Sequence, residues 1–176
     1  MNIRLALVLL VGAALPASPA EAAAEEYQVK GAFLVNFAKF FEWPAQSFKG
    51  PADPISICIL GQNPFGPALD LAARETVVES RALTVHQVSD AHEARQCHIV
   101  FVSISERKRS RALLEAVKGE SVLTVGESEG FLADGGVVNF RLEGDKVRFE
   151  INAKAAALAK LHISAKLLRL AQAGKR

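Results

Sequence analysis

The sequence has 176 residues, of which 50% are hydrophobic, and its formal net charge at pH 7 is +2. This length fits one domain with a single core. The small net charge argues against nucleic acid as a partner, because phosphate-binding proteins gather many Lys and Arg side chains on one face.

The first 24 residues have the pattern of a secretory signal peptide. Arg4 gives a basic start, residues 5–15 form an apolar run, and alanines occupy positions 20, 22 and 24. The apolar run is shorter than the about 20 residues that a membrane-spanning helix needs. No cysteine follows the cleavage region as a lipid attachment site. We therefore expect residues 1–24 to be removed, leaving one domain over residues 25–176 as a free, soluble protein in the periplasm.

Two cysteines, Cys58 and Cys97, remain in the predicted mature chain. In an oxidising compartment paired thiols become oxidised and stay so. We expect a disulfide between them, which contributes roughly 3 to 4 kcal/mol in the chain-entropy model. Two buried free thiols are the alternative, and the CxxC spacing of a redox motif is absent.

Apolar residues recur at helical spacing from Tyr27 to Trp43, which predicts a helix. Lys30 falls on its apolar side, so we expect its ammonium group to extend to water, with a ligand contact as the alternative. Residues 55–60 predict a strand, and the stretch 61–66 leads into a short helix. This stretch lacks GxGxxG and the Walker lysine, so a plain turn is favoured over a phosphate-binding loop.

Further strands are predicted over residues 81–88, 98–102 and 122–125, with a helix from Ser105 to Val117 that Ser105 caps. Strands that alternate with helices predict an α/β fold, a mostly parallel doubly wound sheet with helices on both faces. A disulfide between the first and third strands fits an order in which those strands are neighbours. The basic run 105–111 is solvated surface or, alternatively, a contact for an acidic partner or an anionic membrane.

The segments 137–142 and 146–152 predict an antiparallel hairpin with Gly144-Asp145 as its two-residue loop. In this register the apolar side chains share one face. On the other face Arg141 lies opposite Arg148, which is unfavourable unless an anion is near, and Glu150 is the candidate anion. This face is either a solvated, salt-bridged surface or a binding site.

A helical stretch from Ala153 to about Ala171 follows the hairpin. It carries two apolar stripes with a basic flank between them that includes His162. If the helix is continuous, the second stripe predicts an interface with another chain, and it consists of Ile163, Leu167 and Leu170. A break near Lys160, with Ser164 capping a second segment, is the alternative and would remove this argument.

No combination of residues predicts catalysis. The four histidines fall on separate elements without metal-ligand spacing, and there is no nucleophile elbow. We expect neither an enzyme nor a metal or cofactor site. The mixed charges of four residues suit a partner or a small amino-acid or phosphate-like ligand, and these residues are Arg141, Arg148, Glu150 and His162.

Four blocks of the sequence closely resemble the YfiR-like family, and they occur in the family's order. They are YQVKGAFLVNFAKFFEWP (27–44), ICILGQNPFG (57–66), LTVGESEGFLADGGVVNFRLEGDKVRFEIN (123–152) and AAALAKLHISAKLLRLA (155–171). The resemblance covers nearly the whole mature chain. It implies a mixed α/β sheet with helices on both faces, a periplasmic location and a tendency to form homodimers.

The resemblance also implies a role. The family's namesake represses an inner-membrane diguanylate cyclase by binding its periplasmic sensor region, which lowers cyclic di-GMP and biofilm formation. An outer-membrane lipoprotein relieves that repression. Relatives also occur beside sensor kinases, so a small-ligand sensor that serves another membrane receptor is the second hypothesis.

Two departures from the family pattern stand out. The family commonly has Ala-Gly-Leu where this chain has Ala159-Lys160-Leu161, which favours a continuous helix at this point. With two cysteines only, any second disulfide found in relatives is absent.

Overall fold

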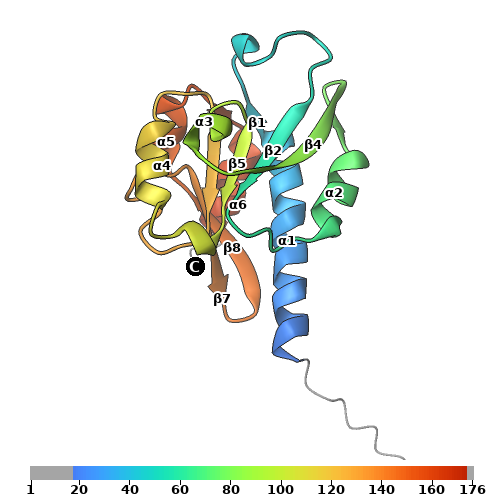
Figure 1. The fold of residues 1–176 in the computed structure, drawn as a ribbon, viewed down its shortest axis with the longest axis vertical. Coiled ribbons are helices and arrows are strands. Elements are labelled where there is room, and N and C mark those ends of the chain that lie inside the picture. The colour runs from blue at the N-terminus through green and yellow to red at the C-terminus, as the bar shows by residue number, and fades with distance from the viewer. Residues whose placement is uncertain (1–17, 174–176) are drawn as a thin grey trace, which may run out of the picture.

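A computed structural model describes residues 18–173. Within them, seven strands form one sheet in the order β3-β4-β2-β5-β6-β7-β8 (Figure 1). The strands that run parallel to their neighbours are β2 (Ile55–Leu60), β4 (Arg81–Val88), β5 (Ile99–Val102), β6 (Leu123–Gly126) and β7 (Val138–Glu143). The edge strands β3 (Val77–Val78) and β8 (Lys146–Ile151) pair antiparallel with β4 and β7. The predicted α/β fold class is confirmed.

Helices cover both faces of the sheet because successive strand side chains point to opposite sides. Ile57 and Ile59 belong to an apolar cluster that includes side chains of α1 (Pro19–Phe40), α2 (Pro67–Arg74) and α6 (Ala165–Ala173). Cys58 and Leu60 belong to a second cluster with α3 (Ala91–Ala94) and α4 (Ser110–Ala116). Burial on both faces explains why this strand is a continuous apolar run.

The helix α1 begins with a capping box. The Ser18 hydroxyl accepts a hydrogen bond from the backbone N–H of Glu21, and the Glu21 carboxylate accepts one from the backbone N–H of Ser18. Pro19 occupies the first helical position, where its missing N–H costs nothing. Residues 1–17, which make up most of the predicted signal peptide, lie outside the described residues.

The observed bounds of α1 correct the predicted helix Tyr27–Trp43. The helix starts earlier, because Ser18 provides a cap, and it ends at Phe40. The next residues form β1 (Phe41–Glu42), which pairs antiparallel with β9 (His162–Ile163) in a separate two-stranded sheet. This pairing with a distant segment ends the helix before the proline that the sequence indicated.

The predicted helix Ser105–Val117 also starts later than expected. The hydroxyl that accepts a hydrogen bond at this point belongs to Ser103 and opens a single 3-10 turn, η2 (Ile104–Glu106), whereas α4 begins at Ser110. Most of the basic run therefore lies in the turn before α4. This placement keeps several cations out of the first turn of a helix, where they oppose the helix dipole.

The hairpin has the predicted register. Gly144 adopts a φ of 62°, which its two-residue turn with Asp145 requires. Apolar and polar residues lie on opposite faces as expected, with the pairs Glu143↔Lys146, Leu142↔Val147, Arg141↔Arg148, Phe140↔Phe149, Asn139↔Glu150 and Val138↔Ile151.

The C-terminal stretch is not one continuous helix. The helix α5 (Ala153–Leu158) ends where Lys160 adopts a left-handed φ of 58°. The Leu161 N–H then donates to the Ala156 carbonyl oxygen at 2.9 Å, which closes the helix end. After β9, the Ser164 hydroxyl accepts a hydrogen bond from the first turn of α6. The break near Lys160 and the Ser164 cap are confirmed, and the continuous helix is wrong.

Because of the break, the three residues of the predicted interface stripe lie in different surroundings. Leu167 is 2% exposed and packs in the first apolar cluster, so it is not available to a second chain. Ile163 is half-buried in β9. Leu170 is 51% exposed on α6 and is the member of the stripe that remains open to contact.

Candidate functional site

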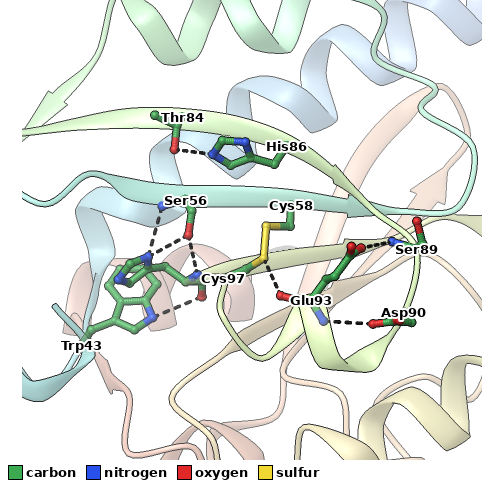
Figure 2. The surroundings of a disulfide bond; sticks show 10 residues. Trp43, Ser56, Cys58, Thr84, His86, Ser89, Asp90, Glu93 and Cys97 are labelled. Atoms are coloured by element: carbon green, nitrogen blue, oxygen red, sulfur yellow. Dashed lines mark hydrogen bonds between the residues drawn. A yellow bond between two sulfur atoms is a disulfide. The ribbon is translucent and has the colours of Figure 1, made fainter. Parts of the chain in front are cut away.

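Cys58 and Cys97 form a disulfide that ties β2 to the turn before β5 (Figure 2). Their Cα atoms lie 6.1 Å apart, both residues are buried, and the two strands are neighbours in the sheet. The predicted pairing is confirmed.

The side chain of His98, the residue after Cys97, is held in place by hydrogen bonds and ring contacts. Its Nδ1 accepts a hydrogen bond from the Ser56 backbone N–H at 3.1 Å and lies 2.9 Å from the Ser56 hydroxyl. The Phe48 ring stacks on the imidazole, and Trp43 packs edge-on. Burial lowers the pKa of His98, so the neutral ring is favoured.

Side chains of the protein already occupy backbone N–H groups of the loop after β2. The Gln62 N–H donates to the Ser105 hydroxyl at 2.9 Å, and the Phe65 N–H donates to the Asn63 side chain at 2.9 Å. A Cβ atom at Gly61 would lie 2.4 Å from the Ser105 hydroxyl oxygen. These contacts support the interpretation of residues 61–66 as a plain turn.

A buried group of charges, which we name the Glu127 cluster, joins α1 to the loop after β6. It consists of Glu26, Tyr27, Lys30 and Glu127. Lys30 is 4% exposed, and its Nζ lies 2.7 Å from a carboxylate oxygen of Glu127, whose side chain is also 4% exposed. Lys30 also pairs with Glu26 one helical turn earlier. The expectation that Lys30 extends to water is therefore wrong, because two carboxylates hold it inside.

Glu127 receives three different donors. The Tyr27 hydroxyl donates at 3.1 Å, the Ile104 backbone N–H at 2.9 Å, and Lys30 provides the cation. Burial and the charge of Glu127 raise the pKa of Tyr27 well above its ordinary value, so the phenol keeps its proton and stays a donor. The cluster fixes α1 against the sheet.

Sequence reasoning did not select Glu127. A glutamate after a strand looks like any surface residue. One signal was available, because a lysine on the apolar side of a helix needs a buried anion if it does not reach water.

Two hollows open next to the cluster. One, of about 280 Å³, lies over the cluster and is also lined by Ile104, Arg141 and Leu142. The other, of about 700 Å³, runs between α1 and the hairpin and includes Val29 and Leu142. Val29, Ile104 and Leu142 are 44% to 51% exposed and border these two hollows. We name these three residues and the cluster the carboxyl-edge surface, since they lie where parallel strands end.

The hairpin brings three of the four predicted ligand residues together. Arg141 and Arg148 both pair with Glu143, at 2.9 and 3.3 Å, and Glu150 lies 3.9 Å from Arg141. Glu150 thus lies near Arg141 as expected, and Glu143 is a second anion, which pairs with both arginines. His162 is not part of this group, because the helix break places it in β9, opposite Glu42.

Among the described residues, no helix is long and apolar enough to cross a membrane. Nor do these residues contain a group of three or more His, Cys, Asp or Glu side chains that could hold a metal ion. The fold and the site define a mixed α/β domain with paired charges and exposed apolar side chains at the carboxyl edge of its sheet.

The chain belongs to the YfiR/HmsC-like family, which matches residues 27–172. Membership implies a periplasmic regulator of diguanylate cyclase signalling, in a family that is regulatory rather than catalytic. No curated protein is significantly similar to the chain.

Among solved structures, the chain is similar to a conserved domain protein from Vibrio cholerae O1 biovar El Tor, with 11% sequence identity and a TM-score of 0.50. The similarity covers 66% of this chain and 53% of that one, so about half of the solved protein is matched. At this identity the likeness concerns the fold alone.

Proposed function

We propose that the protein is a periplasmic regulator that binds the periplasmic sensor region of an inner-membrane diguanylate cyclase and represses it. Repression lowers cyclic di-GMP and biofilm formation, and an outer-membrane lipoprotein relieves it. The family match over residues 27–172 is the observation that carries this proposal. The disulfide supports it, because such bonds persist in an oxidising compartment.

The carboxyl-edge surface is the part of the molecule best suited to contact the cyclase. Protein interfaces combine an apolar centre with a charged rim. Val29, Ile104 and Leu142 provide apolar side chains at this surface. The exposed cations of the basic run, Arg107, Lys108 and Arg109, come shortly after Ile104 in the chain. Contact here would cover side chains that otherwise face water.

Cellular cyclic di-GMP tests the proposal. Deletion of the gene should raise cyclic di-GMP, and the wild-type protein should restore the low level. Leu142→Glu places a charge at the centre of the proposed contact and should fail to restore it. Leu71→Glu is the matched control, because Leu71 is similarly exposed but lies on α2, and this variant should restore repression. An unchanged level on deletion would overturn the proposal.

A small-ligand sensor that serves another membrane receptor, such as a sensor kinase, is a second candidate function. It is favoured by the position of Arg141, which lines the hollow over the Glu127 cluster together with both anionic and cationic groups. A bound ligand raises the melting temperature of the protein that binds it. A thermal-shift screen of amino acids and phosphate-like anions that found no stabilisation would eliminate this candidate. The two functions are compatible, because a ligand can change partner affinity.

A further inference from the structure

A hollow of about 630 Å³ opens at the amino edge of the sheet, where β5 and β6 begin. His98 and Ser121, which come shortly before these two strands, line it. So do residues 46–49, which belong to the 3-10 turn η1 (Ala45–Ser47) and the loop after it. This amino-edge hollow lies at the opposite end of the strands from the carboxyl-edge surface, so it is separate from the contact proposed for the cyclase.

The charged side chains that line the amino-edge hollow are mostly cations. Lys49, Arg95 and Lys160 line it from three separate segments of the chain, and Glu120 is the one anion among the described residues around it. Within residues 18–173 none of these three cations forms an ion pair. The hollow over the Glu127 cluster, in contrast, has as many anions as cations. The excess positive charge at the amino edge favours an anionic ligand.

Lys160 is held in a backbone conformation that a lysine rarely adopts. Its φ of 58° lies in the left-handed region, which glycine enters without strain. The end of α5 fixes this conformation, because the Lys160 N–H donates to the Ala157 carbonyl oxygen at 3.0 Å and the Leu161 N–H donates to that of Ala156. Strained residues of this kind gather at functional sites. A role for the ammonium group accounts for a lysine at a position where glycine would be more stable.

The other two cations are also carried by segments whose positions are fixed. The Arg95 Nε donates to the Ala116 carbonyl oxygen at 2.8 Å, which leaves the two terminal nitrogens of the guanidinium group for a ligand. Lys49 belongs to a turn that Asp53 holds, because this carboxylate accepts hydrogen bonds from the backbone N–H groups of Lys49 and Gly50. Asp53 itself does not line the hollow. The cations are therefore placed before any ligand arrives.

The remaining lining is mostly polar, with amide and hydroxyl groups from Gln46, Ser47, Gln96 and Ser121. We propose that the amino-edge hollow binds a hydrophilic anion with at least two negative charges, either a phosphate compound or a polycarboxylate, through Lys49, Arg95 and Lys160. Both kinds of anion accept charge-assisted hydrogen bonds from these side chains, which are stronger than bonds between neutral groups. The proposal does not rest on repression of the cyclase.

Isothermal titration calorimetry of the purified wild type with pyrophosphate and with citrate tests the proposal. At least one of these anions should bind, and a higher ionic strength should weaken the binding because salt screens the charges. Binding of pyrophosphate alone identifies a site for phosphate compounds, and binding of citrate alone identifies a site for polycarboxylates. Binding of both identifies a site that selects charge. A wild type that binds neither anion would overturn the proposal.

The variant Lys160→Gly separates binding from folding. Glycine suits the left-handed backbone, so the free variant should unfold at a temperature no lower than the wild type, and weaker binding cannot come from a lost fold. Loss of the cation should raise the dissociation constant of the bound anion about tenfold or more.

Two further variants complete the test. Glu120→Gln removes the anion from the lining and should lower the dissociation constant. Lys39→Gln removes an exposed lysine of α1 that does not line the hollow, and this control should bind like the wild type. Unchanged binding in Lys160→Gly, weaker binding in Glu120→Gln, or an equal loss in Lys39→Gln and Lys160→Gly would each contradict the assignment of the site.

Discussion

Replacing Lys30 by methionine removes the cation from the Glu127 cluster while nearly preserving the length of the side chain. Glu127 then keeps two donors, the Tyr27 hydroxyl and the Ile104 N–H, but loses its countercharge. Removing one partner of a buried ion pair typically costs 3 to 5 kcal/mol, and the two remaining donors place our expectation for Lys30→Met at about 3 kcal/mol.

Neutralising the anion Glu127 is expected to cost less stability than removing the cation Lys30. In Glu127→Gln the ammonium group of Lys30 keeps the carboxylate of Glu26, and the glutamine oxygen still accepts one hydrogen bond. We expect a loss of about 1 to 2 kcal/mol, from the donor left unpaired. The double variant leaves neither Lys30 nor Glu127 as a buried charge without its partner, and Glu26, whose side chain is 22% exposed, is within reach of water. Its cost should therefore fall below the sum of the single costs by about 1 kcal/mol or more.

Urea unfolding at pH 7 of the wild type, both single variants and the double variant measures these free energies. Lys118→Met is the control, because Lys118 pairs with Glu115 on the exposed surface and should change stability by less than about 0.5 kcal/mol. A cost below about 1 kcal/mol for Lys30→Met, or costs that simply add, would refute the claim that Lys30 and Glu127 stabilise each other in the interior.

Three further predictions follow from individual features. Tyr27 is the one tyrosine of the sequence, so absorbance at 295 nm should show its phenolate only at a pH well above the ordinary pKa of 10.0. Glu127→Gln should lower the pH at which the phenolate forms. A wild-type titration midpoint near 10.0 would contradict the buried pairing of Tyr27 with Glu127. Cys58→Ser and Cys97→Ser should each cost about 4 kcal/mol in thermal unfolding, and the double variant should be no worse than either, whereas additive losses would mean unpaired thiols. Lys160→Gly should stabilise the protein by about 1 kcal/mol in urea, since glycine adopts the left-handed backbone without strain; an unchanged midpoint would argue against strain at this residue.

The parts of the fold that follow local rules were predictable from the sequence. The hairpin register follows from a two-residue turn and the alternation of Phe140 and Leu142 with polar neighbours. The strand at Ile55–Leu60 is a continuous apolar run between turn residues, and its bounds agree with the structure. In both cases the residues that decide the structure are close together in the chain.

The features that depend on distant contacts were not predictable in the same way. The apolar spacing continues through Lys160, and the residue there is not the glycine that usually marks a helix end, so the pattern favoured a continuous helix. The break is accompanied by the pairing of β9 with β1, far away in the sequence. Likewise, Glu127 becomes a buried partner of Lys30 only when α1 packs against the sheet.

The filled space beside Gly61 limits the kinds of signal that the protein can receive. In doubly wound sheets the crevice where the strand order reverses usually admits a nucleotide or another ligand. In this chain that position lies between β2 and β5, and side chains of η2 fill it, so that a Cβ at Gly61 would also approach Glu106 Cγ to 2.6 Å. Recognition at this edge of the sheet therefore falls to the neighbouring carboxyl-edge surface, which offers exposed apolar side chains to a partner protein and a hollow to a small ligand.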